Sequence, residues 1–283
     1  MSIAVSGATG QLGRLVIEHL KKVAPATELI ALARSVEKAN DLGVPVRHFD
    51  YAAPDTLAPA LKGVKRLLLI SSDAVGQRIP QHRNVIEAAK QAGVTSIVYT
   101  SVLHADTSPL SLAAEHLETE NLIKASGLSF TLLRNGWYTE NYTGSVPAAV
   151  KNGVLAGSAG DGKISSAARI DYADAAAVVL ATEGHADTTY ELAGDTAYTL
   201  SDLAAEISRQ TGKQIPYKNL PEAEYADVLL KAGLPPHWAH GLASFDVSAS
   251  KGALFNEGRQ LSRLIGRPTT PLAESVKEAL AKI

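Results

Sequence analysis

A glycine-rich turn stands between the first apolar run of the chain and its first helical pattern. Gly7, Gly10 and Gly13 follow the run at residues 2–6, and hydrophobic residues recur at helical spacing from Leu12 onward. In such a turn the glycines allow a sharp bend, close approach of a pyrophosphate and tight packing of the helix on the sheet, and the helix N-terminus offers free N–H groups. The sequence therefore predicts a dinucleotide site, with a purely structural turn as the alternative. Its residues are Gly7, Ala8, Thr9, Gly10, Gln11, Leu12 and Gly13.

Short apolar runs alternate with helical patterns through the first half of the chain. The runs lie at residues 2–6, 29–33, 44–49, 67–70, 97–100 and 130–133, and helices are expected at 84–92 and 112–125. Gly93 and Gly127 follow these two helices directly, as is typical of helix C-termini. Apolar strands separated by helices indicate a parallel sheet covered on both faces. We therefore expect an α/β protein with a doubly wound parallel sheet, a Rossmann-type NAD(P)-binding fold.

The second half of the chain has a less regular pattern. We expect a glycine-rich loop at residues 151–166, a helix at 172–182, a strand at 190–192, and a helix at 200–210 with Ser201 as its N-cap. No Pro/Ser-rich linker separates this half from the first. Residues 1–150 are expected to form the dinucleotide-binding Rossmann domain, completed by parts of 151–195. Residues 196–283 are expected to form a smaller, mostly helical substrate lobe packed on it.

Arg34 indicates which dinucleotide the chain binds. In NAD-binding proteins of this fold, an acid at the end of the second strand holds the ribose 2′-OH. The second run here ends at Ala33 and is followed by Arg34, with no acid at that point. A guanidinium can bind a 2′-phosphate with its planar fork. The sequence thus favours NADP, with Lys38 as a second phosphate contact, and the alternative is that Arg34 is a solvated surface residue.

Polar residues at the ends of other runs extend this prediction, because ligands of doubly wound sheets lie at the carboxyl ends of the strands. Asp50 fits a helix cap or a turn equally well. The residues at these ends are Asp50, Tyr51, Ser71, Ser72, Asp73, Ser101, Asn135 and Gly136.

The composition excludes several classes of function. Lys plus Arg is 27 and Asp plus Glu is 29, so the net charge of −2 gives no overall field for nucleic acid or anionic lipid. Cysteine is absent, which excludes disulfides, thiolate metal sites and a cysteine nucleophile. No run approaches the ~20 apolar residues of a membrane helix, and the N-terminus carries no targeting pattern. We expect a cytoplasmic protein with no nucleic-acid partner and no membrane insertion, and the question of a homodimer stays open.

Several motifs together resemble one known family. They are GATGQLG at residues 7–13, Arg34, LLLISS at 67–72, and the most specific one, LRNGWYTEN at 133–141. The combination is similar to the NmrA-like branch of the atypical short-chain dehydrogenases. Within that branch it resembles the second type of bacterial NADPH-dependent quinone oxidoreductase, with triphenylmethane reductase as a near relation. The resemblance covers nearly the whole chain, including GHADTTYELAGD at 184–195 and RLIGRPTTPLAESV at 263–276.

The resemblance implies NADP contacts residue by residue. We expect no metal or flavin, because the sequence has a phosphate-binding turn and Arg34 but no convincing set of metal ligands. In such proteins the segment at 135–140 lies near the nicotinamide. Arg169 matches another cofactor-facing position, and its alternative is a salt bridge with Asp171 or Asp174. The implied contacts are residues 7–12, Arg34, Ser71, Ser72, Asp73, Asn135, Gly136, Trp137, Tyr138, Thr139, Glu140 and Arg169.

The chain departs from the wider superfamily at the usual catalytic pair. Ordinary short-chain dehydrogenases carry Tyr-x-x-x-Lys on the helix after the fifth strand, whereas this sequence has His116 and Glu120 at that spacing. Side chains four residues apart on a helix face the same way. A metal site would need further ligands, so we expect an exposed surface pair.

The missing tyrosine constrains the substrate. Reduction of a simple ketone gives a strongly basic alkoxide and needs a positioned acid. Hydride addition to a quinone gives a phenolate-like anion, and the pKa of a phenol is ~10, so water or a weak acid can complete the proton transfer. The cofactor carries the hydride, and the protein orients the reactants and excludes water. We therefore expect a quinone or a similar electron-poor conjugated acceptor.

Four residues are candidates for the substrate pocket: His104, Trp137, Tyr138 and Asn141. The rings of Trp137 and Tyr138 can stack on a flat quinone or pack in the core. His104 can donate a proton or a hydrogen bond, or it can be an exposed loop residue. No single general acid is assigned, and His104, Tyr138 and Asn141 are the catalytic candidates.

These observations predict an NADPH-dependent quinone oxidoreductase. Two other functions stay open: a catalytically silent, NADP-sensing regulator of the NmrA type, and a reductase of dyes or other xenobiotics. An enzyme needs room for a ring beside the nicotinamide. A regulator would instead cover that face and expose an apolar patch.

Overall fold

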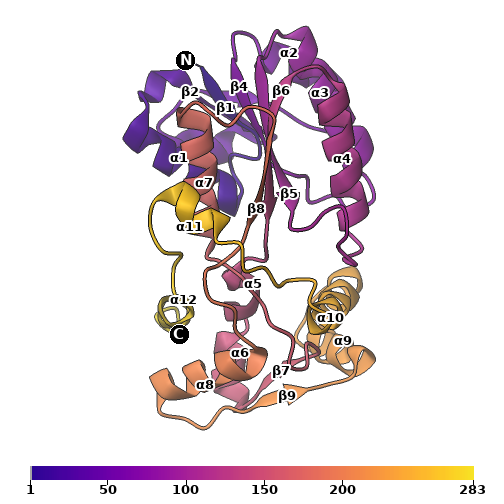
Figure 1. Ribbon diagram of the computed structural model, residues 1–283, viewed down its shortest axis with the longest axis vertical. Helices are drawn as coiled ribbons and strands as arrows, with labels where there is room; N and C mark the ends of the chain where they lie inside the picture. The colour runs from indigo at the N-terminus through magenta and orange to yellow at the C-terminus, as the bar shows by residue number, and fades with distance from the viewer. Residues whose placement is uncertain (1) are drawn as a thin grey trace.

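A seven-stranded parallel sheet forms the centre of the larger lobe in the computed structural model, which describes residues 2–283 (Figure 1). The strand order is β3-β2-β1-β4-β5-β6-β8, with every neighbouring pair parallel. The order reverses at β1 and β4, so the crevice between their carboxyl ends is the expected ligand position. The doubly wound parallel sheet is therefore confirmed. Its strands are β1 (Ile3–Val5), β2 (Leu29–Ala33), β3 (Val46–His48), β4 (Arg66–Leu69), β5 (Ser96–Val102), β6 (Ser129–Asn135) and β8 (Thr188–Leu192).

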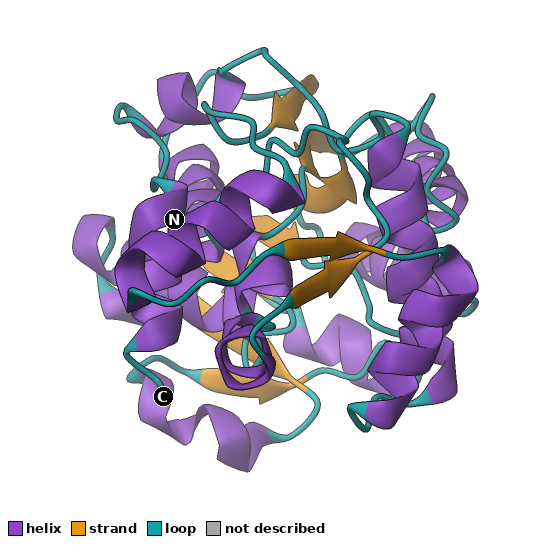
Figure 2. Cartoon of the chain, turned by 90° about the horizontal axis from the view of Figure 1, so that it is seen from below, coloured by secondary structure: helices purple, strands orange, loops and turns teal. Residues whose placement is uncertain are grey.

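Helices cover both faces of this sheet (Figures 1 and 2). One face carries α1 (Gln11–Val23), α7 (Arg169–Ala181) and α11 (Gln260–Ile265), and the other carries α2 (Leu57–Ala60), α3 (Arg78–Gln91) and α4 (Ala113–Ala125). Each face has its own core, because the strands present apolar side chains to both sides. Val16 and Tyr172 lie in the first core, and Val85 and Tyr99 lie in the second. Short 3-10 helices complete the connections: η1 (Ala26–Glu28), η2 (Val36–Leu42) and η3 (Pro54–Thr56).

A smaller lobe lies below the sheet in Figure 1 and has a third core, which includes Val146, Ile164 and Leu203. Strand β7 pairs with β9 there, which contradicts the loop expected at 151–166. That contact joins segments far apart in the sequence, so no local pattern announces it. The elements are α5 (Thr139–Thr143), α6 (Val146–Asn152), β7 (Leu155–Gly157), α8 (Leu200–Thr211), β9 (Tyr217–Asn219), α9 (Glu222–Lys231), α10 (Pro236–Ser250) and α12 (Leu272–Leu280).

Helix α8 begins at Leu200 as expected, but its N-cap lies two residues earlier than the sequence prediction placed it. Thr199, not Ser201, is the N-cap: its Oγ1 accepts a bond from the Asp202 N–H at 3.1 Å, and its own N–H donates to the Asp202 carboxylate at 2.8 Å. This reciprocal capping box satisfies two amides at once, which explains why it prevails over a lone serine.

The division into lobes is not a simple cut in the sequence. α7 and β8 belong to the sheet although the chain reaches them only after α5, α6 and β7. The boundaries at residues 150 and 195 stay predictions. Across residues 2–283, no helix combines the length and the apolar character needed to cross a bilayer.

Candidate functional site

The glycine turn has the close packing that its spacing predicted. Gly7 adopts φ +61°, and Gly10 donates to the Gly7 carbonyl at 2.9 Å. A Cβ on Gly13 would lie 2.4 Å from that carbonyl oxygen, so any side chain there would push α1 off the turn. The N-cap of α1, Gly10, forms no side-chain cap bond, which leaves first-turn amides available. The turn therefore fits a phosphate-bearing cofactor.

A hollow of about 360 Å³ opens beside this turn, at the carboxyl ends of β1, β2 and β4. It brings together most of the residues predicted from the first four strand ends. Ala8 and Leu12 are buried behind the turn instead of lining the hollow. The polar or glycine residues of the lining are Gly7, Thr9, Gly10, Arg34, Ser35, Lys38, Asp50, Tyr51, Ser71, Ser72, Asp73 and Gln81.

Arg34 lies exposed at the rim of the hollow, one residue beyond β2. Within residues 2–283 its guanidinium forms no ion pair or hydrogen bond, whereas the nearby Arg14 pairs with Asp41 at 2.7 Å. An unpaired guanidinium at this position is free to bind an anion. Lys38 lines the same rim.

Tyr51 and Asp50 line the hollow. The Tyr51 hydroxyl donates to the Ile70 carbonyl at 2.8 Å and lies 2.5 Å from Ser6 Oγ, and burial raises its pKa. The Asp50 carboxylate accepts from the Ala52 N–H at 3.0 Å. Asp50 is thus a turn residue that also lines the hollow.

A second group of predicted residues gathers at the end of β6 and the start of α7, outside this hollow. Asn135 is 5% exposed, and its Oδ1 is the buried side-chain atom that has no partner among the described residues. Gly136 packs so closely that a Cβ would lie 2.9 Å from the Tyr172 hydroxyl. An orphaned buried acceptor is costly without a partner, so this site fits a ligand that brings a donor, such as a carboxamide.

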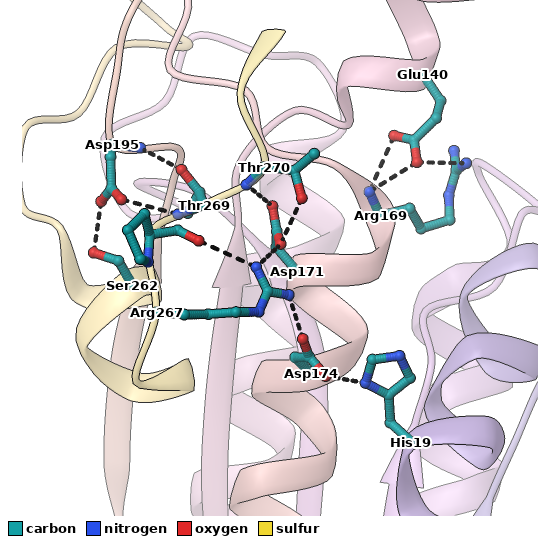
Figure 3. Close-up of polar contacts among 11 residues, drawn as sticks. His19, Glu140, Arg169, Asp171, Asp174, Asp195, Ser262, Arg267, Thr269 and Thr270 are labelled. Atoms are coloured by element: carbon teal, nitrogen blue, oxygen red, sulfur yellow. Dashed lines mark hydrogen bonds and ion pairs between the residues drawn. The ribbon is translucent and has the colours of Figure 1, made fainter. Parts of the chain in front are cut away.

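Arg169 closes this group from the first turn of α7 (Figure 3). Its guanidinium lies 4.6 Å from the Tyr138 ring centroid and 3.8 Å from the Glu140 carboxylate, which also accepts from the Arg169 N–H at 2.8 Å. The alternative pairing with Asp171 or Asp174 is wrong, because Arg267 binds both of those carboxylates. The Glu140 carboxylate thus lies at the N-terminus of α7, where a negative charge is stabilised by the helix dipole.

The aromatic and polar residues predicted for the pocket differ in their burial and contacts. Trp137 is half-buried and meets Phe245 of α10 edge-on, at 5.3 Å between ring centroids. Tyr138 meets Tyr172 edge-on at 5.3 Å. Thr139 is buried with its hydroxyl 2.9 Å from Ser166 Oγ, and Asn141 is exposed on α5.

His104 is not an exposed loop residue. It is half-buried with φ +55°, its N–H donates to Glu191 at 2.9 Å, and its Nε2 lies 3.0 Å from Asn256 Nδ2. These partners hold the imidazole beside the carboxyl end of β5.

His116 and Glu120 contradict the expected surface pair, because both are buried between α4 and the sheet. His116 Nδ1 lies 2.7 Å from the Tyr99 hydroxyl. The Glu120 carboxylate binds the Arg134 guanidinium through two bonds. The prediction was wrong because both side chains have hydrogen-bond partners on the strands that α4 covers: Tyr99 for His116 and Arg134 for Glu120.

A second hollow, of about 240 Å³, lies at the opposite ends of β4, β5 and β6. Arg66 lines it, but its guanidinium already binds the carbonyls of Leu180 and Thr182. It lies away from the carboxyl edge, so we assign no cofactor contact to it. Among residues 2–283, no three His, Cys, Asp or Glu side chains gather as metal ligands would.

Sequence reasoning missed several residues of the site. Gln81 lines the first hollow from α3, and Phe245 and Asn256 reach the end of the sheet from the smaller lobe. Phe245 and Asn256 are far in sequence from the strand ends they approach, and Gln81 lies on the helix after β4, bonded to Ser72 nine positions earlier. The sequence prediction used only the polar residues that directly follow each predicted strand, and none of these three residues is in such a position.

Comparisons with known proteins agree with this geometry. The model of a family described as NAD(P)H-binding matches residues 7–188. The chain is 58% identical to quinone oxidoreductase 2 of Escherichia coli over 277 residues, which cover 97% of each chain.

Two solved structures extend the likeness to three dimensions. One is an NADPH-dependent quinone oxidoreductase from Escherichia coli complexed with NADPH, with a TM-score of 0.96 at 58% identity over 98% of this chain and 99% of that chain. The other is the triphenylmethane reductase of Citrobacter sp. complexed with NADP(H), with a TM-score of 0.95 at 41% identity over 98% of this chain and all of that chain.

Proposed function

The chain belongs to the NAD(P)H-binding family, and from this premise we propose that it is an NADPH-dependent quinone oxidoreductase. The observation that carries the proposal is the 58% identity to the quinone oxidoreductase of Escherichia coli, whose NADPH complex superposes on this fold. The glycine turn, the unpaired Arg34 and the orphaned Asn135 Oδ1 support the same cofactor from within the chain.

The residues at the carboxyl edge of the sheet divide the work of binding. The amides of the first turn of α1 would bind the phosphates of NADPH, and Arg34 with Lys38 would bind its 2′-phosphate. Asn135, Tyr138 and Arg169 would hold the nicotinamide end. Bound NADPH supplies the hydride.

The residues near the proposed nicotinamide position suit a substrate whose reduction needs little acid catalysis. His116 stands at the spacing of the missing tyrosine, but it is buried and bonded to Tyr99. The half-buried Trp137 and Phe245 offer flat apolar surface near the end of β6. An electron-poor ring whose reduced form is a weakly basic phenolate suits this arrangement.

A steady-state assay with purified protein tests the proposal. Loss of reduced-nicotinamide absorbance on addition of a benzoquinone, without added metal or flavin, is the expected result. Cofactor binding with no turnover across a broad quinone panel would favour the regulator instead. Turnover of triphenylmethane dyes but not quinones would favour the dye reductase. A cytoplasmic location and a homodimer stay predictions.

A further inference from the structure

His104 is held in a strained conformation by its surroundings. With φ +55°, it is one of three non-glycine residues with positive φ among residues 2–283. Its N–H donates to Glu191 at 2.9 Å, and its carbonyl accepts from the N–H groups of Thr107 and Ser108. A left-handed backbone is costly for a residue with a Cβ, and such strain persists where the surrounding structure imposes it. The conformation therefore calls for a functional explanation.

The location of His104 suggests what that function is. It follows β5, whose last residue Val102 pairs with Asn135 at the end of β6. The intervening Leu103 N–H donates to the Asn135 carbonyl at 2.9 Å. His104 thus stands beside the edge where the orphaned Asn135 Oδ1 marks the proposed nicotinamide position.

Asn256 determines which nitrogen of the imidazole carries hydrogen. The side-chain Oδ1 accepts from the Gly258 N–H at 2.7 Å, which sets the orientation of the amide, and the backbone N–H of Asn256 anchors the residue by donating to Ser165 Oγ at 3.0 Å. The amide NH₂ then faces His104 Nε2 at 3.0 Å. An amide nitrogen only donates, so Nε2 must accept and the neutral ring must carry its hydrogen on Nδ1.

We propose that Asn256 is a positioning residue that holds His104 as a neutral hydrogen-bond donor through Nδ1–H, available to the oxygen of the bound acceptor. The inference rests on the proposed quinone reductase function. Within residues 2–283, no group of the chain forms a hydrogen bond to Nδ1, which leaves this atom as the open position of the ring. The smaller lobe thereby controls a residue of the larger one.

In this arrangement His104 donates a hydrogen bond to the acceptor but does not transfer its proton. Hydride transfer gives the quinone two electrons and one hydrogen, and leaves NADP⁺ and a hydroquinone monoanion. An Nδ1–H donor stabilises the charge that develops on the oxygen. A neutral imidazole cannot release its only N–H proton without becoming an anion, and the amide at Nε2 supplies no replacement. The second hydrogen of the hydroquinone therefore comes from water.

Nitrogen NMR of histidine-labelled protein tests the assignment without reference to turnover. At about pH 8, where an ordinary imidazole is neutral, His104 is expected to show an unprotonated Nε2 and a protonated Nδ1. His104→Gln identifies the signal. In Asn256→Asp, an isosteric variant, the carboxylate can keep the Gly258 bond and accept from Nε2–H, so Nε2 is expected to gain a proton. A wild-type spectrum with Nε2 protonated overturns the proposal, whatever the variants do.

Kinetics supply the second readout. Asn256→Leu is expected to lower kcat for a benzoquinone about tenfold, the scale of one neutral hydrogen bond, with KM for NADPH unchanged. Asn219→Leu is the matched control, because Asn219 Oδ1 also accepts from a glycine N–H, that of Gly160, without facing a histidine. Wild-type kcat in Asn256→Leu would overturn the proposal. The expected tautomer in a wild type that reduces no quinone would contradict the proposed function and leave the positioning role standing.

Discussion

Glu120 and Arg134 form a two-bond ion pair in the interior between α4 and β6. Arg134 Nε lies 2.9 Å from Glu120 Oε1, and Nη2 lies 2.8 Å from Oε2. Ser101 Oγ donates to the same carboxylate at 2.6 Å, and Glu191 binds the far side of the guanidinium at 2.8 Å. The bonds from Glu120 and Glu191 raise the pKa of Arg134 above its ordinary value. The position that holds a catalytic lysine in related folds is thus part of a structural network here.

Removal of one partner of this pair should be strongly destabilising. Glu120→Gln leaves a buried guanidinium without its main counter-charge, and we expect a loss of about 3–5 kcal/mol in the free energy of unfolding. Urea denaturation measures it. Glu87→Gln, which removes an exposed pair with Lys90 on α3, is the control and should change stability by less than about 0.5 kcal/mol. Equal effects of the two substitutions would mean that Glu120 is solvated.

The buried histidines should make the fold sensitive to acid. Burial, reinforced by the nearby Arg78, lowers the pKa of both His82 and His116 to about 3. Their stabilising contribution is present above pH ~6.5, where the unfolded chain is also neutral, and is lost as the pH falls toward 3. Each histidine should contribute a slope of about 1.4 kcal/mol per pH unit in this window.

His116→Gln should remove one of these slopes from the dependence of unfolding free energy on pH. The exposed His240 on α10 provides the control, because its substitution by Gln should leave the curve unchanged. Turnover of the folded His116 variant should fall by less than about tenfold, below the ~10²–10⁴-fold contribution of a general acid. A pH curve parallel to that of the wild type would contradict the buried, neutral state of His116.

Asp246 should give a pH dependence of stability opposite to that of the buried histidines. It joins α10 to the rest of the smaller lobe by accepting from the Tyr142 hydroxyl at 3.1 Å and the Ser158 N–H at 2.8 Å, yet burial raises its pKa to about 6. The folded state therefore holds this proton more tightly than the unfolded state does. The Asp246 contribution to stability is greatest below pH ~4 and falls as the pH rises to about 6, by up to about 3 kcal/mol.

Asp246→Asn should abolish this fall, and the difference in unfolding free energy between variant and wild type measures it. The control is Asp227→Asn, on the exposed side of α9. A difference that stays constant between pH 4 and pH 7 would show that the Asp246 carboxylate is solvated in the folded state.

The sequence predicted those parts of the molecule whose physics is local. Buried parallel strands must be apolar, so the runs at 29–33 and 67–70 revealed β2 and β4. Arg34 was recognisable because its position relative to β2 and the glycine turn is fixed by the fold.

The remainder depends on contacts between distant segments. Glu120 seemed exposed because its counter-charge, Arg134, lies on a strand that follows the helix. Asn256 contacts His104 from 152 positions away, so neither residue signals the other in the sequence. The hydrogen-bond partners of polar residues decide whether they are buried, and only the fold supplies those partners.

Arg34 should determine the choice between NADPH and NADH. It stands one residue beyond β2, at the rim of the hollow, and has no protein partner within residues 2–283. A hydrogen bond to a charged group contributes about 1.5–3 kcal/mol, which corresponds to a roughly 10- to 150-fold preference for NADPH. Arg34→Ala should remove most of this preference by weakening NADPH binding, with little change for NADH. Arg34→Asp should go further, because a carboxylate repels the 2′-phosphate and accepts from a free 2′-OH.

Fluorescence titration of both cofactors against the wild type and the two variants measures these affinities. Arg209→Ala is the control for loss of an exposed positive charge, because Arg209 pairs with Glu206 on α8, in the smaller lobe. It should leave both dissociation constants unchanged. The preference should also weaken with added salt, because Arg34 is exposed and its field is screened. Equal wild-type affinities for the two cofactors would show that the Arg34 guanidinium turns to solvent and that no group of the chain, Lys38 included, binds the 2′-phosphate.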